Sequence, residues 1–118
     1  MTLSGHDFAA TYAALRTVML RNAGEQIVTE DAPGSLILRT RALDAKGQPG
    51  WFGTVTVKKS YVAYHLMPLY EQPALADGLS PELARRRQGK TCFNFKDVDE
   101  DLFEELAALT ARCASSAG

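Results

Sequence analysis

Apolar residues recur at helical spacing near both ends of the chain. From about Ser4 to Asn22 they fall on one face, which is formed by Phe8, Tyr12, Leu15, Val18 and Met19. This spacing predicts an amphipathic helix with Ser4 as its N-cap. A last helix is predicted after Asp97 or Asp99, and its apolar face comprises Leu102, Phe103, Leu106 and Leu109.

Between these helices the apolar pattern alternates with the period of two that is typical of strands. The predicted strands are Gln26–Glu30, Ser35–Arg41, Trp51–Lys58, Tyr61–Met67 and Thr91–Lys96. Leu36 and Leu38 point to one side, opposite Ile37, Arg39 and Arg41; in the next strand Trp51, Gly53, Val55 and Val57 share a side. Short polar links between the strands indicate an antiparallel meander.

A short helix is predicted before the last strand. Ser80-Pro81-Glu82 has the residue types of a helix start, and Gly89 is expected to end it. Together the elements predict a single α+β domain spanning 1–118, a two-layer α/β sandwich. Its antiparallel sheet carries the N- and C-terminal helices on one face, and the small residues of 113–118 predict a flexible tail.

Composition narrows the classes of partner. The net charge of −1 gives no general attraction to nucleic acid or anionic membranes, so we expect neither as a partner. No apolar run approaches the roughly 20 residues of a membrane span. Two cysteines, Cys92 and Cys113, are few for a small secreted domain, which predicts reduced thiols and a cytoplasmic location.

The candidate chemistry lies in the second half of the chain. His65 shares a strand face with Tyr61, and a histidine can act as a general base or a proton switch. A half-buried histidine packed against the sheet is the interpretation we favour. Lys90 and Thr91 enter a strand after a helix, a common position for anion recognition. Cys92 could pair with His65 as a nucleophile, but its bulky aromatic neighbours favour an inert thiol.

The basic run Arg85-Arg86-Arg87 lies on the predicted short helix. Successive helical residues point about 100° apart, so only one of the three can join Lys90. Favourable interaction with the helix dipole explains the run more simply. The predicted ligand-binding set is therefore Tyr61, His65, Arg86, Lys90 and Thr91, and we assign no catalytic residue.

Acidic residues are the candidate metal ligands. Glu100 and Glu104 have the i, i+4 spacing that can share a cation, and Glu30 and Asp31 lie in an early strand. Capping and the helix dipole explain most of the acids near the last helix start. The sequence has no zinc-type His/Cys spacing, no GxSxG, no P-loop and no GxGxxG.

Three segments carry a family resemblance. Tyr61–Tyr70 reads YVAYHLMPLY, Leu79–Leu83 reads LSPEL, and Gln88–Phe95 reads QGKTCFNF. In these segments the chain resembles the YdhG-like domain family, a bacterial domain of unknown function. The resemblance implies a frataxin-like sandwich, and some relatives are described as frataxin-like intracellular iron chaperones. Iron binding of that type is associated with acids in the first helix and strand, where this chain has Asp7, Glu25, Glu30 and Asp31.

Three functional hypotheses remain open. The favoured one is a non-catalytic binding domain for a small anion or, by the resemblance, for iron. The second is a homodimeric protein-interaction module that uses the exposed sheet face. The third is an enzyme that uses His65, with Tyr61 or Cys92 beside it.

Overall fold

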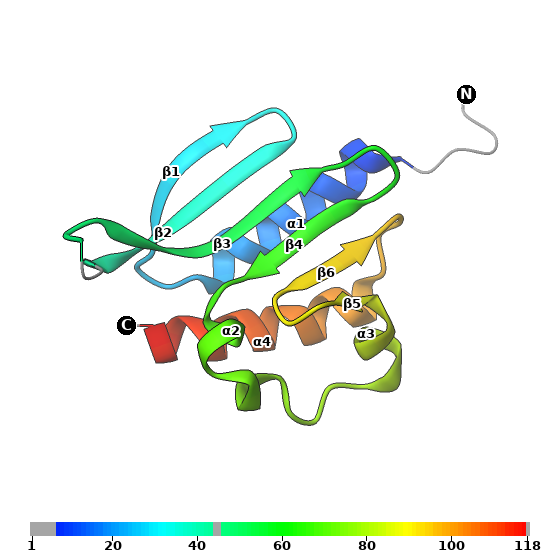
Figure 1. Cartoon of the computed structure of the whole chain (residues 1–118). Helices are drawn as coiled ribbons and strands as arrows, with labels where there is room; N and C mark the ends of the chain where they lie inside the picture. Colours follow the sequence, from blue (N-terminus) through cyan, green and yellow to red (C-terminus); the bar gives the residue numbers. More distant parts are fainter. Residues whose placement is uncertain (1–6, 44–45, 118) are drawn as a thin grey trace.

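One antiparallel sheet of six strands carries two long helices on one of its faces (Figure 1). The computed structural model describes residues 7–43 and 46–117. Neighbouring strands are antiparallel in the order β1-β2-β3-β4-β6-β5. This arrangement confirms the predicted α+β class and its two layers. The elements are α1 (Phe8–Asn22), β1 (Ile27–Ala32), β2 (Ser35–Leu43), β3 (Pro49–Val57), β4 (Val62–Leu66), α2 (Pro68–Glu71), the 3-10 helix η1 (Pro73–Ala76), α3 (Pro81–Arg86), β5 (Arg87–Gln88), β6 (Cys92–Phe95) and α4 (Glu100–Ala117).

Helix α1 begins where an aspartate can cap it. The Asp7 carboxylate accepts a hydrogen bond from the Ala10 N–H at 3.0 Å, which satisfies a free donor of the first turn. The cap expected at Ser4 lies outside the described residues. The predicted apolar face is confirmed: its buried members are Tyr12, Leu15 and Met19, while Phe8 and Val18 pack partly against the core.

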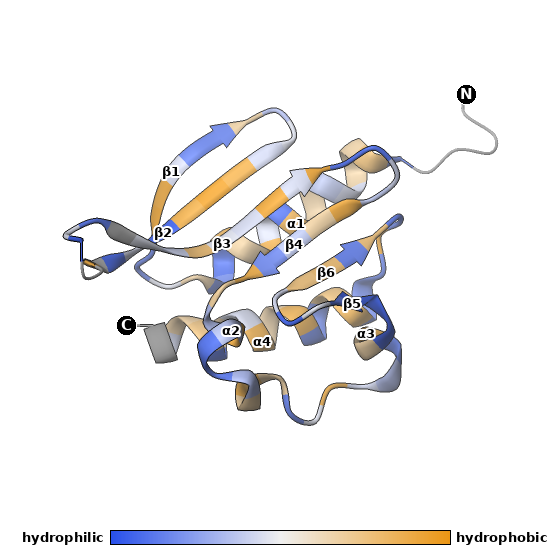
Figure 2. Cartoon of the chain, in the orientation of Figure 1, coloured by the Kyte–Doolittle hydropathy of each residue, from blue (hydrophilic) through white to orange (hydrophobic). Residues whose placement is uncertain are grey.

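Strand alternation places apolar side chains under the helices. Leu36, Val55, Tyr64 and Phe93 are Cα partners across four strands, and all four are fully buried. Figure 2 shows that β2 is mostly orange, whereas β3 and β4 mix orange with paler and blue positions. Gly53 lets α1 approach closely, because a Cβ there would lie 2.6 Å from Met19 Cε.

A β-bulge in β3 overturns one predicted strand face. Leu38 pairs with Gly53 and Arg39 with Trp51, so Phe52 is an extra residue in the ladder. Beyond the bulge, the strand residues point to the opposite faces from those that strict alternation predicts. Phe52 is fully buried, whereas Trp51 is 46% exposed. The prediction that Trp51 shares a side with Gly53 and Val55 was therefore wrong.

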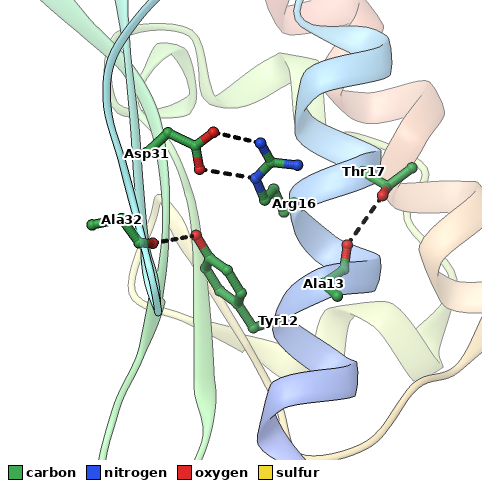
Figure 3. Close-up of polar contacts among 6 residues, drawn as sticks. All are labelled: Tyr12, Ala13, Arg16, Thr17, Asp31 and Ala32. Atoms are coloured by element: carbon green, nitrogen blue, oxygen red, sulfur yellow. Dashed lines mark hydrogen bonds and ion pairs between the residues drawn. The ribbon is translucent and has the colours of Figure 1, made fainter.

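The β1–β2 hairpin is held to α1 by polar contacts (Figure 3). Arg16 forms a bidentate ion pair with Asp31, in which Nε–H donates to Oδ1 at 2.9 Å and Nη2 contacts Oδ2. The Tyr12 hydroxyl donates to the Ala32 carbonyl at 3.2 Å. The guanidinium lowers the pKa of Asp31 below its usual range. These contacts attach a strand whose six residues are all exposed.

Helix α3 ends earlier than Gly89, the residue predicted to end it. Its last residue is Arg86, because Arg87 and Gln88 pair with β6 as a short edge strand. The Gly89 backbone, with φ +69°, instead makes the turn between the two strands.

Contacts with α4 fix the start of α3. The Ser80 hydroxyl oxygen accepts from the Leu83 N–H at 3.1 Å, as predicted for an N-cap. Ser80 also donates from its backbone N–H and its hydroxyl to Glu105, at 2.8 and 2.7 Å. The cap of α3 is therefore itself bound to the last helix.

Helix α4 extends through the segment predicted to be a flexible tail. Asp99 caps it, accepting from the Leu102 N–H at 3.1 Å. Its helical turns continue to Ala117 because Cys113 and Ala114 are buried in the core. Of the predicted tail 113–118, only residue 118 lies outside the described residues. No helix within 7–43 and 46–117 is long and apolar enough to cross a membrane.

The contact between Ser80 and Glu105 predicts a measurable stability loss. Glu105→Ala removes the acceptor of two hydrogen bonds to a charged group, which should lower the free energy of unfolding by about 1.5–3 kcal/mol. Urea denaturation monitored by circular dichroism measures this change. The exposed neighbour Glu104 is the matched control, and Glu104→Ala should change stability by less than about 0.5 kcal/mol. Equal losses in the two variants would contradict the assignment.

Candidate functional site

Among the helices of residues 7–43 and 46–117, none lies over the face of the sheet opposite α1 and α4, and we call it the uncovered face (Figure 1). Antiparallel sheets commonly bury one face and leave the other to solvent. Two rows of Cα partners define it: Ile37, Thr54, His65 and Cys92 in one row, and Ser35, Thr56, Ala63 and Asn94 in the next. His65 and Cys92 are half-buried in the middle of this surface.

His65 meets the turn between β5 and β6. Its Nδ1 lies 3.3 Å from Thr91 Oγ1, within hydrogen-bond distance. The Leu66 N–H donates to the Thr91 carbonyl at 2.8 Å, so Leu66 and Thr91 form a hydrogen-bonded pair. His65 and Cys92 are then a non-hydrogen-bonded pair, the kind in which facing side chains approach most closely. The structure therefore brings together His65, Thr91 and Cys92.

Lys58 adds a positive charge to this group. It follows β3 with the same parity as Thr54 and Thr56, which lie on the uncovered face. Burial lowers the pKa of His65, and repulsion from the Lys58 ammonium lowers it further. The same ammonium acts on Cys92, where it opposes the rise in pKa that burial causes. Lys58 is thus close enough to influence both side chains.

Cys92 is not poised as a nucleophile. Its thiol donates to Asn94 Oδ1 at 3.1 Å, and burial raises its pKa. Because the thiolate is the nucleophilic form, a raised pKa keeps this thiol unreactive near neutral pH. The Asn94 carbonyl oxygen accepts that bond, which leaves the amide N–H groups as donors for a ligand.

The other predicted ligand-binding residues do not contact His65. Tyr61, just before β4, has the parity of the uncovered face but lies four residues from His65, or about 13 Å along an extended strand. Arg86 is exposed on α3. The Lys90 ammonium lies 5.4 Å from the centre of the Tyr70 ring, and Arg87 donates to the Lys90 carbonyl at 3.2 and 2.7 Å.

The acidic metal candidates are dispersed over different elements. Asp31 is engaged by Arg16, and Glu30 accepts a hydrogen bond from Ser35 Oγ at 2.5 Å. Glu100 and Glu104 are exposed on α4. Among the residues that the structure describes, no three His, Cys, Asp or Glu side chains are grouped to hold a metal ion.

Sequence reasoning missed Lys58 and Asn94 as members of the group around His65. The signal for both was available in the period-two pattern. Lys58 continues the parity of Thr54 and Thr56, and Asn94 that of Cys92. The prediction placed Lys58 at the end of the strand Trp51–Lys58 and in the polar turn that follows it, without assigning it to a site.

Comparison of the chain with protein-family models, with curated proteins and with solved structures found no match. The resemblance to the YdhG-like family therefore stays a prediction.

The lowered pKa of His65 predicts a pH-dependent stability. In the unfolded chain the pKa of His65 is near its ordinary value of 6.5. In the native fold that pKa is lower, so His65 is protonated only at lower pH. Stability from this residue is therefore complete above about pH 6.5 and declines as the pH falls below that value. Urea denaturation between about pH 7.5 and pH 5 should show this decline, and His65→Gln should reduce it. Identical pH profiles would contradict the shift.

A second measurement separates the two causes. In Lys58→Met the NMR titration midpoint of the His65 ring should rise part of the way to 6.5, because burial is the larger cause. Lys59→Met, at the exposed neighbouring lysine, is the control and should leave the midpoint unchanged. A midpoint equally insensitive to both substitutions would remove Lys58 from the site.

Proposed function

We propose that this chain is a non-catalytic binding domain that takes a small anion on the uncovered face, beside His65. The observation that carries the proposal is the group of polar side chains on this face, where His65 Nδ1 lies 3.3 Å from Thr91 Oγ1 and Cys92 and Asn94 follow along β6. Lys58 has the parity of the same face, and its charge acts on both His65 and Cys92. A cation together with half-buried neutral donors on one face is suited to a carboxylate or phosphate.

The donors around Lys58 fit an anionic ligand. If the Thr91 hydroxyl donates to Nδ1 of the neutral imidazole, Nε2 carries the proton and can donate to the ligand. The Asn94 amide and the Lys58 ammonium provide further N–H groups. Partial burial strengthens such bonds relative to those in bulk water.

The same geometry disfavours catalysis. The Cys92 thiol stays protonated and is bound to Asn94. His65 interacts with the hydroxyl of Thr91, whereas a general base is usually oriented by a carboxylate or carbonyl. These features support binding over the alternative of an enzyme that uses His65.

An anion is also favoured over iron as the ligand. The iron hypothesis comes from the YdhG-like resemblance and needs several oxygen ligands of negative charge. Glu30 and Asp31 are already bonded to Ser35 and Arg16. On the uncovered face, Lys58 would repel a metal cation near His65.

Anion binding should appear as thermal stabilisation that depends on Lys58. Phosphate at about ten times its Kd should raise the free energy of unfolding by about 1.4 kcal/mol, because it binds the native state alone. For a domain of this size that corresponds to a Tm increase of roughly 5 °C. Differential scanning fluorimetry with phosphate or sulfate, at constant ionic strength with chloride, measures the shift.

Matched lysine variants locate the site. Lys58→Met should abolish the phosphate-induced shift, whereas Lys59→Met should retain it. Lys90→Ala should also retain it, since the Lys90 ammonium lies over Tyr70. If all the variants respond as the wild type does, or if phosphate gives no shift beyond that of chloride, the proposed function is wrong.

A further inference from the structure

We propose that the uncovered face binds single-stranded nucleic acid, with backbone phosphates near Lys58 and a base stacked on Trp51. The inference rests on the proposed function, because the phosphate is the anion of that site. It depends on three observations: an outward-facing tryptophan, a line of rings, and a separation of charge between the two faces of the molecule.

Trp51 faces outward because of the bulge in β3. Its side chain is 46% exposed, and the Arg39 guanidinium lies 3.9 Å from its ring centre. The two residues are Cα partners on neighbouring strands. Bases of any sequence can stack on an exposed aromatic ring, and the Arg39 guanidinium plane over Trp51 adds a second surface on which a base can stack.

The rings on the uncovered face form a line along the strands. Tyr61, the residue before β4, has the same parity as His65 by the period of two. Gly53 is the Cα partner of Leu66, so Trp51 lies beyond His65 in the direction away from Tyr61. The three rings therefore span roughly 20 Å of strand length, which is longer than one nucleotide and suits a short single strand.

Charge is distributed unequally between the two faces. Arg39, Lys58 and Lys96 have the parity of the uncovered face, where the acid Glu30 already accepts from Ser35. On the helix side, a hollow of about 410 Å³ between α3 and α4 is lined by Ser80, Glu82, Asp99, Asp101, Leu102 and Glu105. The net charge of −1 predicts no nucleic-acid partner. That total is a sum over two faces of different charge, so it does not describe the charge of the uncovered face alone.

This charge favours nucleic acid over a second copy of the chain as the occupant. Two uncovered faces packed against each other would bring cations toward cations, whereas a phosphate backbone neutralises them. A sheet surface with exposed rings suits unstacked bases, as opposed to the edges of a duplex. The contact should therefore prefer single strands.

Salt dependence follows from the number of cations. Neutralising about two phosphates, at Lys58 and Lys96, gives a slope of roughly −1.4 for log K against log salt on a single strand. Removal of one lysine should make that slope shallower by about 0.7. Lys58→Met should therefore both weaken binding at low salt and reduce its sensitivity to salt.

The single tryptophan makes the test direct. An oligothymidylate of about 15 nucleotides, added at low salt, should quench the fluorescence of Trp51 by stacking on it. Anisotropy of a labelled oligonucleotide should show at least about fivefold weaker binding for Trp51→Leu, the low end of a stacking contribution. Tyr70→Leu is the matched control. Tyr70 is 63% exposed, but it lies on α2, which packs against α4. The Tyr70→Leu variant should therefore bind the oligonucleotide with wild-type affinity.

Several outcomes would overturn the inference. These are absence of quenching, wild-type affinity in Trp51→Leu, or equal affinity for a duplex. A dimer seen by light scattering that Trp51→Leu dissociates, with no oligonucleotide binding, would assign the face to a second copy. If phosphate gives a Lys58-dependent shift in Tm but the oligonucleotide does not bind, this inference fails and the anion site stands. If neither binds, both proposals fail.

Discussion

Burial of the sheet beneath α1 and α4 organises the whole molecule. Leu15, Met19, Leu106 and Leu109 are fully buried against it, and each such side chain contributes about 1.5–3 kcal/mol. Because strand residues alternate, covering one face commits the intervening residues to the other. Thr54, His65 and Cys92 share one surface for this reason. The position of the site therefore follows from which strand residues are buried in the core.

The hydrophobic pattern predicted a helix or strand and its buried face correctly where that pattern alone determines the structure. Both sides of β2 and the buried face of α1 are examples. The prediction was wrong where a distant partner decided. The bulge at Phe52 depends on pairing with β2, the early end of α3 on pairing between β5 and β6, and the helical turns at Cys113 on burial in the core. None of these partners is visible in the local sequence.

The members of the candidate site could be predicted from local sequence, but their contacts could not. His65 and Thr91 were both among the predicted ligand-binding residues, but only the sheet register shows that they meet. Lys58 obeys the strand period and could have been found from sequence. Lys90 could not have been placed, because Tyr70 and Arg87 determine the direction of its side chain and the shape of its turn.

One buried hydroxyl pair has a consequence for how α4 settles on the sheet. Thr110 donates to the Leu106 carbonyl at 2.8 Å, so Tyr64 must donate in its 2.6 Å contact with Thr110. Leucine contacts alone would tolerate several alignments of a helix sliding along its axis. If α4 slid along its axis by one turn, the Tyr64 hydroxyl would be buried without a hydrogen-bond partner, at a cost of about 1–3 kcal/mol. Apolar side chains thus provide the cohesion, and two hydroxyls select a unique docking position.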